Sequence, residues 1–198
     1  MFRPFAQIIM LKLTKTNKNI NLIVALGNVG NEYLLTRHNA GFLFADSIRR
    51  FLNDQGYETR TEREKDYILT KFSGLELSIL QPTTMMNSSG RAVQSFLKYH
   101  SNKHQISSLM LAHDDLDLGL DTYKLQFAKA PKNHNGITSV ENELGTKDFF
   151  RLRIGIENRE LEDNITGMEY VLKKFTQTEL QTLESLYTRI IEREISIV

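Results

Sequence analysis

The segment from residue 20 to residue 52 constrains the fold of this chain most strongly. The apolar run INLIVAL at residues 20–26 predicts a buried strand, and the turn Gly-Asn-Val-Gly at residues 27–30 follows it at once. Residues 39–52 then place their apolar side chains largely on one face of a helix. A strand, a glycine turn and an amphipathic helix in this order indicate an α/β chain.

The rest of the chain continues the alternation of strands and helices. Further strands are predicted at residues 66–72, 75–81, 109–112, 121–127 and 152–156. Further helices are predicted at residues 88–100, at residues 137–144 before Gly145, and after the capping-box pair Thr176 and Glu179. We therefore predict a single-domain, three-layer α/β fold over residues 20–198, with a mixed, mostly parallel twisted sheet flanked by helices.

Composition excludes several classes of protein. The 198 residues suit one domain, and the net charge of +1 gives no global argument for nucleic-acid binding. The absence of cysteine excludes disulfides, thiolate metal sites and a cysteine nucleophile, and it fits a reducing compartment. No apolar run approaches the length of a membrane span, so we expect a cytoplasmic protein.

Residues 1–19 form a basic N-terminal extension with no acidic residue. It carries Arg3, Lys12, Lys15 and Lys18, which an organellar transit peptide could also show. We favour a ragged basic N-terminus with Met10 as an alternative start, because the segment is short and contains little Arg or Ser.

His38, in the segment TRHNAG, is the histidine that we predict to be catalytic. A neutral imidazole can accept a proton from water near pH 7. Asp114, at the end of a predicted strand, is the natural partner, since a carboxylate fixes the tautomer of the ring and stabilises the imidazolium. Asp115 and Asp117 are interpreted as solvated turn residues, although the three aspartates could instead form a cation site.

Asn28, Asn87 and Asn135 follow predicted strands or precede predicted helices. An amide side chain offers a donor and an acceptor without charge, which suits a peptide group or a developing oxyanion. Taken alone, each asparagine is more often a turn former or a helix cap than a binding residue.

Other mechanisms fit the sequence poorly. The glycine turn lacks the third glycine of a dinucleotide fingerprint, there is no Walker A lysine motif, and Ser88-Ser89-Gly90 is not a nucleophile elbow. His113 beside Asp114 has no second histidine at ligand spacing. Metal-free, cofactor-free general-base hydrolysis is the simplest chemistry left.

Four ordered motifs carry a resemblance to a known family. They are LGNVGNEYLLTRHNAGF, PTTMMNSSG, HDDLDLG and NHNG. Together they resemble bacterial-type peptidyl-tRNA hydrolase over about residues 20–190, a family that cuts the ester between a stalled peptide and its tRNA. The resemblance implies that His38 activates water and that Asp114 supports it.

The same resemblance implies roles for the remaining site residues. Asn28, Asn87 and Asn135 would hold the peptide and the 3′ adenosine end, Tyr33 would line the same cleft, and Arg153 would clasp the tRNA 5′ phosphate. The chain departs from the family pattern in three places. Pro131-Lys132-Asn133 replaces a Gly-rich run, Met85 replaces the usual Phe, and Gln126 stands where a phosphate-binding lysine is common, with Lys124, Lys129 and Lys132 nearby as substitutes.

We therefore expect a monomeric, metal-free peptidyl-tRNA hydrolase that binds tRNA and recycles it from stalled translation. One alternative is a non-catalytic RNA-binding relative, which the altered loop at residues 128–134 favours and the presence of His38 and Asp114 opposes. Another is an esterase for small acyl or peptidyl esters, which the missing lysine favours and Arg153 opposes.

Overall fold

The computed structural model describes residues 11–14, 18–100, 105–129, 133–160 and 164–197. Within these residues the main sheet has seven strands in the order β4-β5-β6-β3-β7-β9-β8. The four neighbouring strands at its centre run parallel; they are β6 (Leu75–Pro82), β3 (Leu22–Ala25), β7 (Leu109–Gly119) and β9 (Phe150–Glu157). The flanking strands run antiparallel; they are β5 (Tyr67–Phe72), β4 (Thr59–Arg63) and β8 (Tyr123–Phe127).

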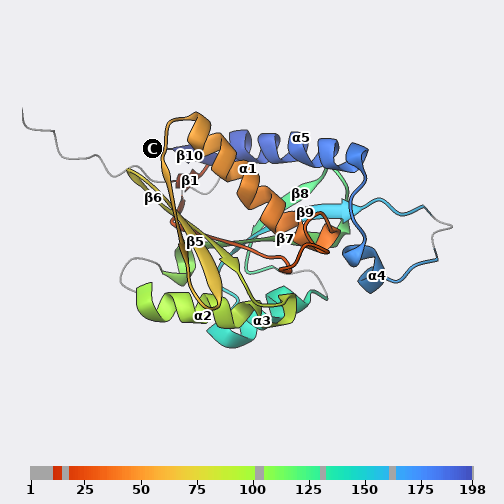
Figure 1. Cartoon of the computed structure of the whole chain (residues 1–198), viewed down its shortest axis with the longest axis horizontal. Coiled ribbons are helices and arrows are strands. Elements are labelled where there is room, and N and C mark those ends of the chain that lie inside the picture. The colour runs from red at the N-terminus through yellow and green to blue at the C-terminus, as the bar shows by residue number, and fades with distance from the viewer. Residues whose placement is uncertain (1–10, 15–17, 101–104, 130–132, 161–163, 198) are drawn as a thin grey trace, which may run out of the picture.

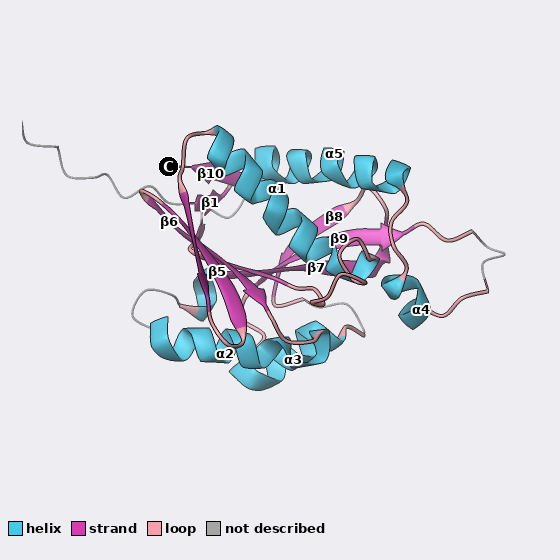
Figure 2. Cartoon of the chain, in the orientation of Figure 1, coloured by secondary structure: helices cyan, strands magenta, loops and turns pink. Residues whose placement is uncertain are grey.

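Helices cover both faces of this sheet, as Figures 1 and 2 show. One face carries α1 (Ala40–Asp54) and α5 (Gln177–Glu194), and the other carries α2 (Ser89–His100) and α3 (Asn135–Leu144). The short helix α4 (Gly167–Leu172) lies at one end of the molecule. The predicted three-layer α/β fold with a mixed sheet is therefore confirmed, with its parallel part at the centre.

The alternation of side chains along β3 explains the two cores. Ile23 packs in the cluster that contains Phe44 of α1 and Tyr187 of α5. Val24 points to the opposite face, into the cluster that contains Phe96 of α2 and Ile137 of α3. Successive residues of a strand face opposite sides, so one apolar run supplies both layers.

Part of the predicted N-terminal extension is folded. Strands β1 (Leu11–Leu13) and β2 (Lys18–Ile20) form a small antiparallel sheet with the C-terminal strand β10 (Ile195–Ile197), and Leu13 is fully buried. The ragged N-terminus expected over residues 1–19 is thus wrong for this part, and the expected boundary at residue 20 falls inside β2. The strands are too short to show a periodic pattern, and their pairing depends on the distant C-terminus. Arg3 and Lys15 lie outside the described residues.

Most local predictions hold, with one difference that matters for the site. The hairpin around Gly74, the end of α3 at Gly145 and the Thr176/Glu179 capping box of α5 are confirmed. The strand expected to end at Asp114 continues to Gly119, because Asp114 and Asp115 pair with Ile154 and Gly155 of β9. None of the described helices has the length and apolar character to cross a membrane.

Candidate active site

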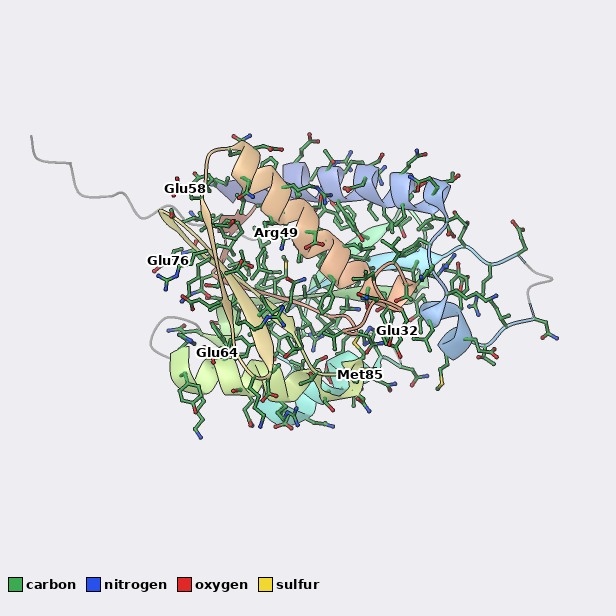
Figure 3. The ribbon with its side chains drawn as sticks, in the orientation of Figure 1. Glu32, Arg49, Glu58, Glu64, Glu76 and Met85 are labelled. Carbon is green, nitrogen blue, oxygen red and sulfur yellow. The ribbon has the colours of Figure 1, made fainter. Side chains whose placement is uncertain are left out.

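A cleft of about 710 Å³ opens at the carboxyl ends of the central parallel strands. In α/β folds this edge is where ligands bind. Figure 3 shows Glu32 and Met85 toward this end of the molecule and Glu58 and Glu76 toward the opposite one. Seven predicted site residues line the cleft: Asn28, Tyr33, His38, Met85, Asn87, Asp114 and Asn135.

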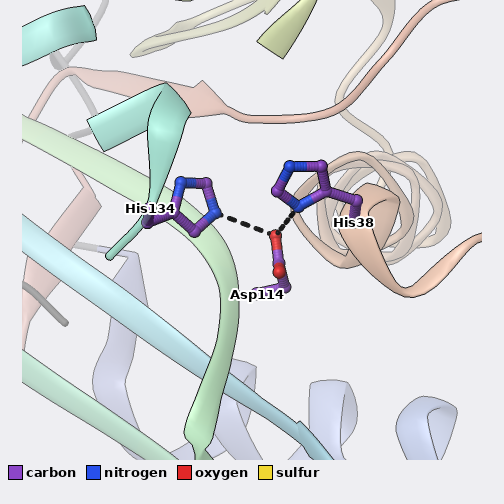
Figure 4. Close-up of side chains that lie close together, drawn as sticks. All are labelled: His38, Asp114 and His134. Carbon is purple, nitrogen blue, oxygen red and sulfur yellow. Dashed lines mark hydrogen bonds and ion pairs between the residues drawn. The ribbon is translucent and has the colours of Figure 1, made fainter. Parts of the chain in front are cut away.

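His38 and Asp114 are hydrogen-bonded, as the sequence predicts. His38 lies in a short 3-10 helix, η1 (Arg37–Asn39), and its Nδ1 is 2.9 Å from Oδ1 of Asp114 (Figure 4). Gly41 makes this approach possible: a Cβ there would lie 2.4 Å from the carbonyl oxygen of Ala112 in β7. Because Nδ1 faces the carboxylate, Nε2 of His38 is the ring nitrogen left to act on a substrate or on water.

The pair is electrostatically coupled. Burial alone would lower the pKa of His38, but the charge and hydrogen bond of Asp114 outweigh it, so the pKa is raised above its ordinary value. Burial would raise the pKa of Asp114, which is 2% exposed, yet His38 and His134 hold it well below its usual range. Asp114 therefore stays ionised and supports an imidazolium on His38.

His134 is a site residue that the sequence interpretation missed. Its Nε2 lies 2.9 Å from the same Oδ1 of Asp114, as Figure 4 shows. Its Nδ1 caps α3 by accepting the backbone N–H groups of Gly136 and Ile137 at 3.1 and 3.4 Å. Since Nδ1 accepts, the ring proton is on Nε2 and is donated to Asp114. The available signal was its place in NHNG, directly before a predicted helix.

His113, in contrast, is a buried residue of the protein interior. It is fully buried, and its Nδ1 lies 2.6 Å from the carbonyl oxygen of Asp114. Burial lowers its pKa to about 3, so the ring is neutral. It packs edge-on against His134, with 5.0 Å between ring centroids.

His38, Asp114 and His134 also have the composition of a metal site, since one ligand atom from each lies within 4.8 Å of the others. His113 is not part of this group, and sequence spacing does not reveal the group because its two histidines come from distant segments. Their hydrogen bonds favour protons over an ion. Nε2 of His134 would have to lose its proton to ligate a metal, while its Nδ1 already caps α3.

Asn28 is fixed by its neighbours. Its Oδ1 accepts the backbone N–H of Met86 at 2.8 Å, and Asn39 bonds both its N–H and its carbonyl, at 2.7 and 3.0 Å. Asn28 therefore offers the cleft its Nδ2 donor alone. Asn39, next to His38 in TRHN, was also missed. Asn87 and Asn135 are exposed and line the cleft, and Oδ1 of Asn87 also accepts the hydroxyl of Ser88 at 3.4 Å.

Three of the predicted phosphate-binding residues, Arg153, Lys124 and Lys129, are not among the residues that line the cleft. Arg153 stands opposite Lys124 in register, but its Nε bonds Oδ2 of Asp115 at 2.5 Å and its Nη1 bonds Gln126 at 2.9 Å. Asp115 is 1% exposed, so its interpretation as a solvated turn residue is wrong; it lies within β7 and pairs with Arg153. Asp117 is exposed, as predicted, but it lies within β7 and not in a turn.

Two of the three lysines expected to bind tRNA phosphates together with Arg153 are among the described residues. Lys124 and Lys129 are exposed on and after the edge strand β8. Lys132 and Pro131 lie outside the described residues. Lys124 and Lys129 therefore offer exposed positive charge, while the charge of Arg153 is balanced by a carboxylate.

An imidazole held by a buried carboxylate, with amide donors across an open cleft, defines a hydrolytic enzyme that activates water with a general base. The family model described as peptidyl-tRNA hydrolase matches residues 22–197. The chain belongs to the peptidyl-tRNA hydrolase family.

Individual relatives agree with this assignment. A peptidyl-tRNA hydrolase of Thermodesulfovibrio yellowstonii is 34% identical over 179 residues, covering 89% of this chain and 91% of that protein. One of Aliarcobacter butzleri is 37% identical, covering 83% and 85%. The crystal structure of the enzyme from Acinetobacter baumannii superposes with a TM-score of 0.73 at 30% identity, covering 87% of this chain and 85% of that one.

Proposed function

We propose that this protein hydrolyses the ester bond between the peptide and the 3′ end of tRNA in peptidyl-tRNA, and so recycles tRNA from stalled or aborted translation. Family membership over residues 22–197 supports this reaction, as do relatives that carry the name of the activity. The observation that carries the chemistry is the hydrogen bond between Nδ1 of His38 and Asp114, which leaves Nε2 for the cleft.

In the proposed reaction, a water molecule bound to Nε2 of His38 attacks the ester carbonyl as the imidazole takes its proton. Asp114 stabilises the imidazolium that forms. The Nδ2 donor of Asn28, held in place by the bond from Met86 to Oδ1, faces the developing oxyanion. The imidazolium then returns the proton to the leaving 3′ oxygen of the tRNA.

The substrate is held by the other residues of the cleft. Asn87 and Asn135 at the rim pair with the peptide and the 3′ adenosine, while Met85 and Tyr33 supply apolar walls. Lys124, Lys129, Lys132 and Arg153 contact the phosphates of the tRNA. We assign Lys124 and Lys129 the larger share, because Arg153 is already paired with Asp115.

We further propose that the enzyme works as a cytoplasmic monomer without a metal ion. The arrangement of His134 supports metal independence, since the nitrogen that would ligate an ion carries a proton that Asp114 needs. Turnover is expected to be the same with and without a strong chelator. Loss of turnover in chelator, restored by one divalent ion, would contradict this part.

The direct test uses purified protein and peptidyl-tRNA, with release of tRNA as the readout and His38→Ala as the control. Ester cleavage that depends on His38 supports the proposal. Tight tRNA binding without cleavage would support the non-catalytic alternative, and cleavage of small esters without activity on peptidyl-tRNA would support the esterase.

A further inference from the structure

Arg37 precedes the proposed base directly, yet its side chain turns away from the cleft and is buried. The side chain is 7% exposed. Nη2 bonds Oε1 of Glu179, at the start of α5, at 2.6 Å, and Nη1 bonds the carbonyl oxygens of Lys174 and Lys173 at 2.8 and 3.3 Å. One side chain thus joins η1 to the segment between α4 and α5.

Aromatic rings enclose the same guanidinium. Its carbon lies 4.2 Å from the ring centre of Tyr170 in α4 and 5.1 Å from that of Phe175. The hydroxyl of Tyr170 in turn donates to the carbonyl oxygen of Ile156 in β9. A desolvated guanidinium against aromatic faces, with its ion pair satisfied, strongly favours one geometry.

The backbone on both sides reinforces this connection. The N–H of Arg37 donates to Lys173 at 3.1 Å, the N–H of Phe175 donates to Leu35 at 2.9 Å, and Thr36 forms a bridge with Lys174. Residues 35–37, directly before His38, are therefore bonded to residues 173–175 through the main chain, and the side chain of Arg37 adds further hydrogen bonds.

Those residues directly follow a wall of the cleft. Gly167, Met168, Val171 and Leu172 of α4 all line it, facing the space that His38 also lines. The end of α4 determines how far this wall lies from His38. Arg37 bonds the two residues that directly follow that end, Lys173 and Lys174. Moving α4 away would separate the buried cation from the ring of Tyr170 and from the carbonyl oxygens that directly follow α4, at a free-energy cost.

We infer that Arg37 is a positioning residue, which fixes the imidazole of His38 and the α4 wall at one separation, so that an ester held against the wall lies within reach of the base. This inference rests on the proposed function, with His38 as the base. Misplacement of a reacting group by about 1 Å can cost about 100-fold in rate, so the effect should appear in kcat.

The test replaces Arg37 with Met, which keeps the apolar stem and removes the charge. Turnover per folded molecule on peptidyl-tRNA should fall by about 10- to 100-fold, with a much smaller change in KM. The acidic limb of the pH–rate profile should also move to lower pH, because a loosened His38 loses part of its bond to Asp114; His134 faces the same carboxylate and stays unchanged. Simple destabilisation would lower the folded fraction without moving this limb.

Two further variants make the test specific. Arg37→Lys keeps a cation for Glu179 but loses the forked contacts to the carbonyls, so turnover should be intermediate. Arg50→Met removes another ion pair to α5, that of Arg50 with Glu184, which is exposed and outside the cleft, and it should keep wild-type turnover.

Wild-type kcat and an unmoved acidic limb in Arg37→Met would overturn the inference. If that variant does not fold, Arg37→Lys and Glu179→Gln decide in the same way, and unchanged kinetics in both would overturn it. His38→Ala, assayed in parallel, separates the two levels: an active His38→Ala contradicts the proposed function, whereas a normal Arg37→Met beside an inactive His38→Ala removes the role of Arg37 alone.

Discussion

His134 and His38 donate to the same oxygen of Asp114, each across 2.9 Å. Both bonds require an ionised carboxylate, and the low pKa of Asp114 provides one. The proposed base is therefore oriented by a carboxylate that is itself held by the first turn of α3 through His134. The site is a three-residue unit, in which one carboxylate oxygen of Asp114 accepts from both histidines (Figure 4).

Asp114→Asn should lower turnover by less than the loss of His38 does and should change its pH dependence. Asp114 raises the pKa of His38, so in the wild type the base becomes protonated, and inactive, at a higher pH than a free histidine would. Without the carboxylate that pKa falls, and the acidic limb of kcat/KM should shift to lower pH. An unmoved limb in a pH titration of the variant would show that Asp114 does not act on the titrating base.

His134→Ala and His134→Asn should separate the two roles of this residue. Alanine removes the cap of α3 and should destabilise the protein by about 1 kcal/mol, whereas asparagine is a good cap and should retain most of the stability. Both variants lose the donor geometry toward Asp114, so both should turn over more slowly. Chemical denaturation and turnover measure the two effects, and a fully active His134→Asn would limit the residue to capping.

N-blocked aminoacyl-tRNA should be hydrolysed faster than free aminoacyl-tRNA. Asn28 offers only a donor to the cleft, and the buried carboxylates are committed, Asp114 to two histidines and Asp115 to Arg153. A free ammonium bound beside Asn28 would be desolvated without a carboxylate of its own, because the remaining carboxylate of the cleft, Asp117, is solvent-exposed. Matched assays on the acetylated and free forms of one aminoacyl-tRNA test this, and equal rates would contradict it.

Lys124→Ala should weaken tRNA binding and reduce its salt dependence by about one phosphate contact. Arg153→Ala should behave differently, because it leaves the buried Asp115 unpaired and should destabilise the fold by about 3–5 kcal/mol. Arg153→Ala/Asp115→Asn should recover much of that stability. Binding titrations at several salt concentrations, with denaturation of each variant, distinguish the two residues. A stable Arg153→Ala with a flattened salt slope would instead make Arg153 the main phosphate contact.

The parts of the fold that local patterns determine could be predicted. The apolar run of β3, the Gly74 hairpin and the capping box of α5 each depend on neighbouring residues, and each was correct. Asp115 was misplaced because the length of β7 is set by pairing with β9, far along the chain. The fold of residues 11–13 depends in the same way on β10.

The residues of the site also divide into those that a local motif indicates and those that depend on contacts between distant segments. His38 and Asp114 could be chosen because their chemistry is distinctive and their motifs resemble a family. His134 and Asn39 act through bonds to Asp114 and Asn28, and such partners become visible only when distant segments meet. The balanced charge of Arg153 was hidden for the same reason, since Asp115 reaches it from the neighbouring strand β7.

The most direct test of the account is the turnover of His38→Ala on purified peptidyl-tRNA, measured beside its affinity for the same substrate. General-base catalysis contributes about 10²- to 10⁴-fold, so turnover should fall by that factor. Affinity should stay close to the wild-type value, because the proposed contacts to tRNA are made by other residues. Near-normal turnover by a folded His38→Ala would contradict the account.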